Sequence, residues 1–197
     1  MTKTEKLSHF IDLRNGYLSI ADVQALGISR TYVREYIAAN GLERVAHGVY
    51  KSPEVFTDDL YILALKNKKA IYSFDTALML NGLTEREPAE IFVTVPRAYN
   101  ASHLRGMGVI VNYVRDEWAE LGKTVVKTTY GNEVSVYDRE RTICDILRVR
   151  KKKDPQMFAY AIKEYAKNVN KNLPKLARYA KELGVETELR RYMEVLL

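Results

Sequence analysis

The sequence has 197 residues, of which 47% are hydrophobic and 28% are charged. This composition excludes an intrinsically disordered chain and is typical of a globular protein with one domain or two small ones. The formal net charge of +6 is compatible with a polyanionic partner such as DNA but does not require one.

The sequence also restricts the cellular compartment. Its single cysteine, Cys144, excludes an internal disulfide, which fits a reducing environment. The first residues do not resemble a signal peptide, and no apolar run approaches the roughly 20 residues that cross a bilayer. We therefore expect a cytoplasmic protein that does not bind membranes.

The N-terminal region predicts three helices followed by a hairpin. Apolar residues at helical spacing predict a helix over residues 4–13. Ser19, with Asp22 three residues later, predicts a capping box at the start of a second helix. Ser29 predicts the N-cap of a third helix that ends at an Asn-Gly pair, and two short strands surround Gly48. This order is typical of a winged helix-turn-helix domain.

The remaining sequence predicts a larger mixed domain. Pro53 and the polar residues after it indicate a boundary, so we expect a DNA-binding domain over residues 1–54 and a second domain over 55–197. Helices are predicted at about 57–68 and 74–81, followed by strand-like segments between 90 and 137 and helices from there on. The predicted fold class is α/β (α+β), a winged helix-turn-helix followed by a mixed domain with a small β-sheet and a helical C-terminal part.

The third predicted helix has the features of a DNA-recognition helix. In a helix-turn-helix the second helix of the pair lies in the major groove, where its first turns reach the base edges. Arginine can donate two bonds to guanine, and the hairpin can contact the DNA backbone. Tyr32 lies between the apolar and polar faces, so core packing and phosphate contact are both open. The residues expected to contact DNA are Ser29, Arg30, Thr31, Tyr32 and Arg34 on the helix, and Arg44, His47 and Lys51 on the hairpin.

Two further basic clusters, at residues 66–69 and 148–153, lie in the predicted second domain. Cations at a helix end can simply offset the negative end of the helix dipole, or they can extend a phosphate-contacting face. Both alternatives are open. The second cluster adds five candidate phosphate contacts: Arg148, Arg150, Lys151, Lys152 and Lys153.

Signatures of catalysis or cofactor binding are weak. The sequence has no phosphate-binding glycine loop, and its three histidines are scattered, so we predict no cofactor and no metal site. Cys144 lies in an apolar stripe and is predicted to be a buried structural thiol. A metal-dependent nuclease would need clustered carboxylates. Glu133 and Asp138 are the candidates, but no lysine follows Glu133 at the required spacing.

We therefore predict that the protein is not an enzyme. Two alternatives stay open: a metal-dependent DNA-acting enzyme targeted by the winged helix, and a transcriptional regulator whose second domain senses a small molecule.

Three segments in order resemble the AbiEi antitoxins of bacterial type IV toxin–antitoxin systems, which act in abortive infection and phage resistance. They are "GISRTYVREYIAANGLERVAHGVYK", "AIYSFDTALMLNGLTEREPAEIFVTVP" and "VSVYDRERTICDIL". In the last two segments, Ser73 is a predicted helix cap and Gly82 a helix stop. Arg141 and Asp145 are predicted to belong to a buried network that joins sheet and helix.

The resemblance implies a function in two parts. A winged-helix domain would repress the protein's own operon, with two molecules binding inverted repeats in the promoter cooperatively. A C-terminal domain would counter a nucleotidyltransferase-like toxin without a stable complex. The implied DNA-contacting positions are the eight residues given above for the helix and hairpin, and no motif marks a toxin-neutralising surface.

Overall fold

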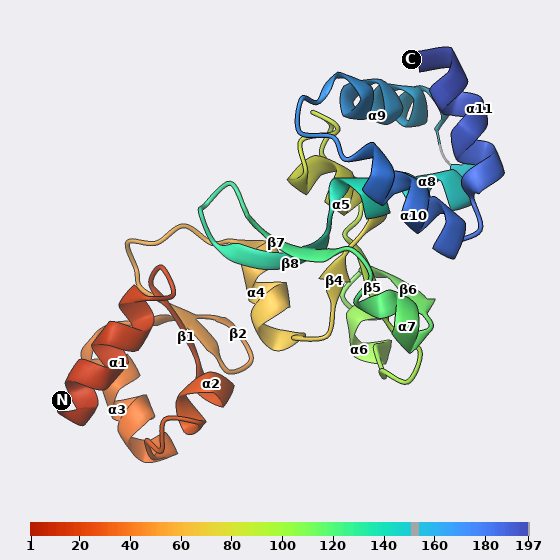
Figure 1. Ribbon diagram of the computed structural model, residues 1–197. Coiled ribbons are helices and arrows are strands. Elements are labelled where there is room, and N and C mark those ends of the chain that lie inside the picture. The colour runs from red at the N-terminus through yellow and green to blue at the C-terminus, as the bar shows by residue number, and fades with distance from the viewer. Residues whose placement is uncertain (151–153, 197) are drawn as a thin grey trace. The chain divides into compact units, whose positions relative to one another are not determined.

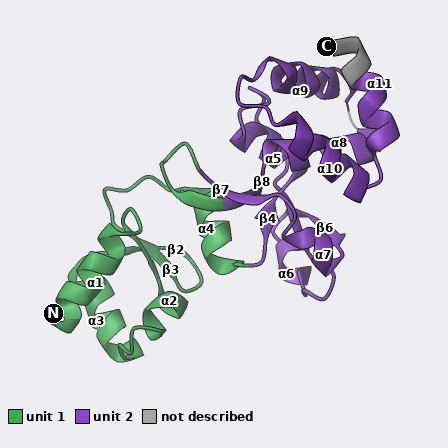
Figure 2. Cartoon of the chain, viewed as in Figure 1, with its two compact units in different colours: residues 1–68, 127–134 green, residues 69–126, 135–197 purple. Residues whose placement is uncertain are grey.

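The computed structural model describes residues 1–150 and 154–196 and forms two compact units (Figures 1 and 2). Unit 1 comprises residues 1–68 and 127–134, and unit 2 comprises residues 69–126 and 135–197. Helices and two β-sheets occur together, which confirms the mixed α/β fold class. Within the described ranges, no helix is long and apolar enough to cross a membrane.

Unit 1 has the order of a winged helix-turn-helix, and the three predicted helices and the hairpin are confirmed. β1 pairs with β3 and β3 with β2, all antiparallel. β1 was not predicted, because three residues are too few to show strand alternation. The elements are α1 (Lys3–Asp12), β1 (Tyr17–Ser19), α2 (Ile20–Gln24), α3 (Arg30–Ala39), β2 (Glu43–Ala46), β3 (Val49–Lys51) and α4 (Asp59–Lys66).

A capping box forms in unit 1, but at a different helix from the predicted one. Thr2 and Glu5 cap each other's backbone at the start of α1. The Ser19 side chain makes no cap hydrogen bond, so the predicted box at α2 is wrong. The Asp22 carboxylate instead pairs with Arg14 at 2.9 Å and with Lys68 at 3.2 Å.

A buried carboxylate fixes the segment that follows the hairpin. Asp58 caps α4 by accepting from the backbone N–H of Tyr61 at 3.0 Å. It also accepts from Thr128 Oγ1 at 2.5 Å and from Asn132 Nδ2 at 2.7 Å. Asp58 therefore joins the start of α4 to residues 127–134 within unit 1. The predicted domain boundary between residues 54 and 55 stays a prediction.

Most of a five-stranded mixed sheet, with the order β6-β5-β4-β8-β7, belongs to unit 2; Lys127 of β7 and the first two residues of β8 are counted in unit 1. The strand-like segments predicted between residues 90 and 137 are confirmed as β5, β6, β7 and β8, and the predicted helices are confirmed as well. β4, α6 and α7 were not predicted, because they are too short to show a period. The elements are β4 (Ile71–Tyr72), α5 (Phe74–Leu80), β5 (Phe92–Pro96), α6 (Ser102–Arg105), β6 (Ile110–Val114), α7 (Asp116–Ala119), β7 (Lys123–Lys127), β8 (Glu133–Tyr137), α8 (Arg139–Val149), α9 (Pro155–Lys167), α10 (Leu173–Glu182) and α11 (Glu186–Leu196).

The two predicted ends of α5 have different outcomes. Gly82 follows α5 with a φ of +68°, which favours glycine, so the predicted helix stop is confirmed. Ser73 occupies the N-cap position, but its hydroxyl accepts from Thr94 Oγ1 at 2.9 Å and makes no cap bond. Ser73 is therefore the N-cap residue of α5 by position, as predicted, but its side chain does not cap the helix, because a tertiary partner on β5 bonds to the hydroxyl.

A guanidinium group is fully buried in the core of unit 2. Arg141 is 0% exposed, and its Nε donates to Asp145 at 3.0 Å. Its Nη1 donates to the carbonyl oxygens of Trp118 and Leu121, both at 2.7 Å. The guanidinium also lies over the Tyr137 ring, 4.2 Å from its centroid. The predicted buried network is confirmed.

Cys144 lies in the same helix and in the apolar core of unit 2. Burial raises the pKa of its thiol to about 12, so the thiolate is scarce at neutral pH. The predicted buried structural thiol is confirmed.

Breaking the buried ion pair should destabilise unit 2 strongly. Asp145→Asn leaves the Arg141 charge buried without its counterion, and we expect a loss of about 3–5 kcal/mol in the free energy of unfolding. The measurement is urea unfolding followed by the fluorescence of Trp118, the single tryptophan.

Glu186→Gln is the matched control, because it breaks an exposed pair with Arg190 at the same i, i+4 spacing. We expect a loss below about 1 kcal/mol for this variant. Equal unfolding midpoints for the two variants would contradict the assigned role of the Arg141 network.

Candidate nucleic-acid interface

The position of α3 is fixed by its apolar face and its two ends. Val33 is 2% exposed and packs into a core with residues of α1, β1 and α2. Gly27, with a φ of +71°, ends the turn after α2, and Ile28 is buried beside it. Ser29 caps the helix by accepting from the backbone N–H of Tyr32. The predicted helix and its N-cap are confirmed.

The opposite face of α3 is polar and exposed. Arg30, Thr31 and Arg34 all lie on the surface in the first turns of the helix. In the amide orientation that satisfies both groups, the Gln24 side-chain oxygen accepts from Arg30 Nε at 2.6 Å and from its Nη2 at 3.0 Å. This contact at the end of α2 orients Arg30 beside the start of α3, and sequence patterns gave no sign of it.

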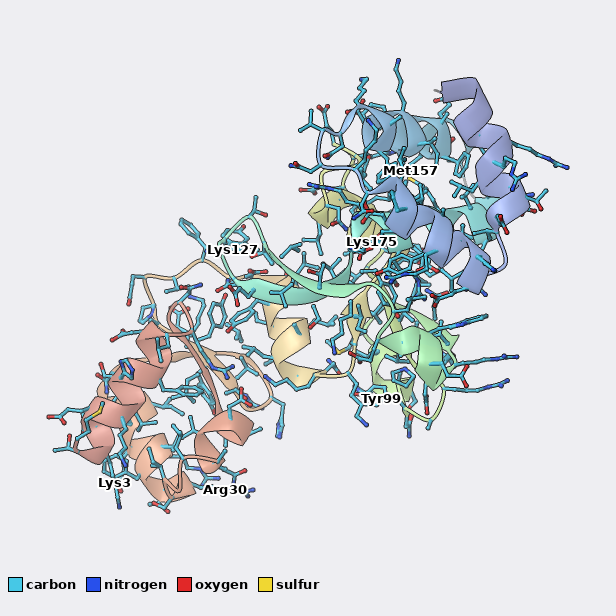
Figure 3. All side chains as sticks on the ribbon, viewed as in Figure 1. Lys3, Arg30, Tyr99, Lys127, Met157 and Lys175 are labelled. Atoms are coloured by element: carbon cyan, nitrogen blue, oxygen red, sulfur yellow. The ribbon has the colours of Figure 1, made fainter. Side chains whose placement is uncertain are left out.

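Tyr32 lies on the flank of α3 that faces α1. Its ring is partly buried against the unit 1 core, and its hydroxyl shares a hydrogen bond with Thr4 Oγ1 at 2.6 Å. The ammonium of Lys3 lies 5.6 Å from the ring centroid, so the starts of α1 and α3 are adjacent (Figure 3). Tyr32 therefore combines core packing with a position at the edge of the exposed face.

Two of the three hairpin residues predicted to contact DNA are exposed, and the third is buried. Arg44 and His47 are exposed, and Arg44 Nη2 donates to His47 Nδ1 at 3.2 Å. Lys51 is 6% exposed, and its Nζ pairs with Glu43 at 2.7 Å. Glu43 lies directly opposite Lys51 in the pairing of β2 with β3. Lys51 therefore stabilises the hairpin internally and does not present its charge at the surface.

Residues 5–53 match the family model of the AbiEi antitoxin transcriptional regulators. The match includes the whole of the first resembling segment, from α3 to the hairpin, and it confirms the resemblance over these residues. No curated protein matches the sequence.

Among solved structures, the RV2827C protein from Mycobacterium tuberculosis is similar over 88% of this chain and 69% of its own chain. The TM-score is 0.55 and the sequence identity is 14%, a level at which the similarity shows the fold alone.

The second basic cluster lies outside the AbiEi match, and its described members have internal partners. Arg148 lies over the Trp118 ring, 5.1 Å from its centroid, and Arg150 pairs with Glu188 at 3.3 Å. Lys151, Lys152 and Lys153 lie outside the described residues. For Arg148 and Arg150 these contacts favour a structural role over phosphate contact.

The carboxylates considered for a nuclease have separate environments. Glu133 is an exposed residue of β8. Asp138 caps α8 through the backbone N–H of Arg141 and pairs with Lys175 at 2.7 Å. In the part of the chain that the structure describes, no group of three or more histidine, cysteine or acidic residues could hold a metal ion.

Loss of the α3 cap should weaken unit 1 by a moderate amount. Ser29→Ala leaves a backbone N–H of the first turn without its side-chain acceptor, and we expect a cost of about 0.5–2 kcal/mol. The measurement is urea unfolding followed by far-ultraviolet circular dichroism. Ser8→Ala, at an exposed site inside α1, is the matched control and should be nearly neutral. A neutral Ser29→Ala would show that the cap contributes nothing to α3.

Proposed function

We propose that the protein is an antitoxin and a transcriptional autorepressor, acting in the cytoplasm. The observation that carries the proposal is the exposed polar start of α3, which lies inside the residues that match the AbiEi regulator model. A capped helix with an apolar inner face and arginines on its outer first turns is the geometry that major-groove binding requires.

In this proposal α3 enters the major groove of the protein's own promoter. The Arg34 guanidinium donates two bonds to guanine O6 and N7, and Thr31 contacts a base or phosphate. The free backbone N–H groups at the helix start, beside Ser29, attract a phosphate. Arg30 and Tyr32 border this face, and Arg44 and His47 on the hairpin contact the DNA backbone. Two molecules bind inverted repeats cooperatively.

The second half of the proposal concerns the toxin. The region predicted as residues 55–197 counters a nucleotidyltransferase-like toxin without forming a stable complex with it. Support comes from the second and third segments that resemble AbiEi antitoxins, at residues 70–96 and 134–147.

The DNA-binding half is tested by fluorescence anisotropy with DNA from upstream of the gene and with scrambled DNA, at several salt concentrations. We expect selective binding at physiological salt, because phosphate contacts alone would be lost as salt rises. Arg34→Ala should weaken binding to the upstream DNA by about 1–3 kcal/mol, since it removes a base contact.

Arg97→Ala is the matched control for this change, because Arg97 is exposed and lies outside the matched residues. It should leave selectivity unchanged. Unaltered binding for both Arg30→Ala and Arg34→Ala would overturn the assignment of α3 as the recognition helix.

The division of labour is tested with the double variant Arg30→Ala/Arg34→Ala in the full chain. It should lose repression of a promoter reporter and still rescue cells that express the toxin, because both changes are confined to α3. Reporter fluorescence and colony counts measure the two activities in the same strain. A folded double variant that fails to rescue would contradict separate DNA-binding and antitoxin regions.

A further inference from the structure

The outward face of α3 also carries a carboxylate. Successive residues of an α-helix are 100° apart, so Glu35 lies about 160° around the axis from the buried Val33. Glu35 is exposed, and among the described residues it makes no hydrogen bond or ion pair. Its charge therefore points away from the protein core and is not neutralised by a neighbour.

The residues around Glu35 leave the carboxylate accessible. On the same face, the neighbours one turn before Glu35 are Thr31 and Tyr32, and those one turn after are Ala38 and Ala39. Thr31 and the two alanines have short side chains and are exposed, whereas the Tyr32 ring is partly buried against the unit 1 core and its hydroxyl is hydrogen-bonded to Thr4. Arg34, directly before Glu35 in the chain, is long and exposed. A surface that meets α3 face-on therefore meets Arg34 and Glu35 first.

A carboxylate on a face that binds DNA is costly unless it finds a donor. It repels phosphates, and once water is removed it can only accept hydrogen bonds. In the major groove cytosine N4 offers a donor, whereas guanine and thymine offer acceptors at the same edge. Adenine offers a donor at N6, but its adjacent N7 is an acceptor and would repel the carboxylate.

We propose that Glu35 is a specificity-determining residue, which accepts a hydrogen bond from the N4 amino group of a cytosine in the bound half-site. This inference depends on the proposed DNA-binding function of α3. Arg34 contributes affinity and a preference for guanine, whereas Glu35 selects a C·G pair mainly by excluding the others.

The experiment measures base preference at every position. Anisotropy titrations use the full chain and duplexes in which each base pair of the bound half-site is replaced in turn by the other three. The wild type should prefer C·G at one position by about 10–100-fold. Glu35→Ala should bind all four base pairs at that position within about twofold and keep its preferences elsewhere, because it removes the acceptor and leaves Arg34 intact.

Two further variants separate recognition from net charge. Glu35→Gln adds a donor to the side chain and should move the preference at this position toward A·T, since glutamine pairs with adenine N6 and N7. Glu54→Gln makes the same charge change at an exposed site in the loop before α4 and should keep the wild-type preferences.

The outcomes distinguish the two proposals. If the wild type prefers its upstream DNA and Glu35→Ala keeps every base preference, the role of Glu35 is overturned while the repressor proposal stands. If the wild type binds upstream and scrambled DNA equally, the repressor proposal fails and the role of Glu35 fails with it.

Discussion

The burial of the Arg141 guanidinium is the constraint on which the larger unit depends. A buried charge needs hydrogen-bond partners, and here Nε and Nη1 find them on α8, α7 and the turn before β7, whereas Nη2 has none among the described residues. Close packing adds a second requirement at Gly122, where a Cβ atom would lie 2.5 Å from Arg141 Cβ. Gly122 also has a φ of +76°, which favours glycine. One side chain thus fixes segments that are distant in the sequence.

Asp58 has a similar role in unit 1. The three hydrogen bonds that its carboxylate accepts join the start of α4 to residues 127–134, where β7 turns into β8. Asn15 adds to this contact, because its Nδ2 donates to Asn132 Oδ1 at 2.9 Å. In each unit, therefore, a buried charged group with several hydrogen bonds connects segments that apolar packing alone would leave without a specific register.

The sequence predicts the features that depend on neighbouring residues. Helical periodicity, Ser29 and the Asn-Gly pair locate α3 and its exposed arginines, because caps and periods act within a few residues. Prediction from the sequence fails where a residue distant in the chain determines the contacts of a side chain. Ser73 bonds to Thr94 instead of capping, and the burial of Lys51 follows from the cross-strand position of Glu43. Strand register has no local signature in the sequence, so the burial of Lys51 could not be predicted.

Arrangement, and not net charge, explains how unit 1 could bind DNA. Unit 1 contains ten lysines and arginines and nine acidic residues, which gives it a net charge of +1. With Arg34 assigned to guanine, Arg30 and Arg44 are the arginines of the proposed face that remain for phosphates. Few phosphates would then be neutralised, and the logarithm of the affinity would fall with the logarithm of the salt concentration with a slope of only about −2. One copy on one half-site would then be held weakly. Selective occupancy would have to come from base contacts by α3 and from two copies bound together, which is the arrangement that inverted repeats impose.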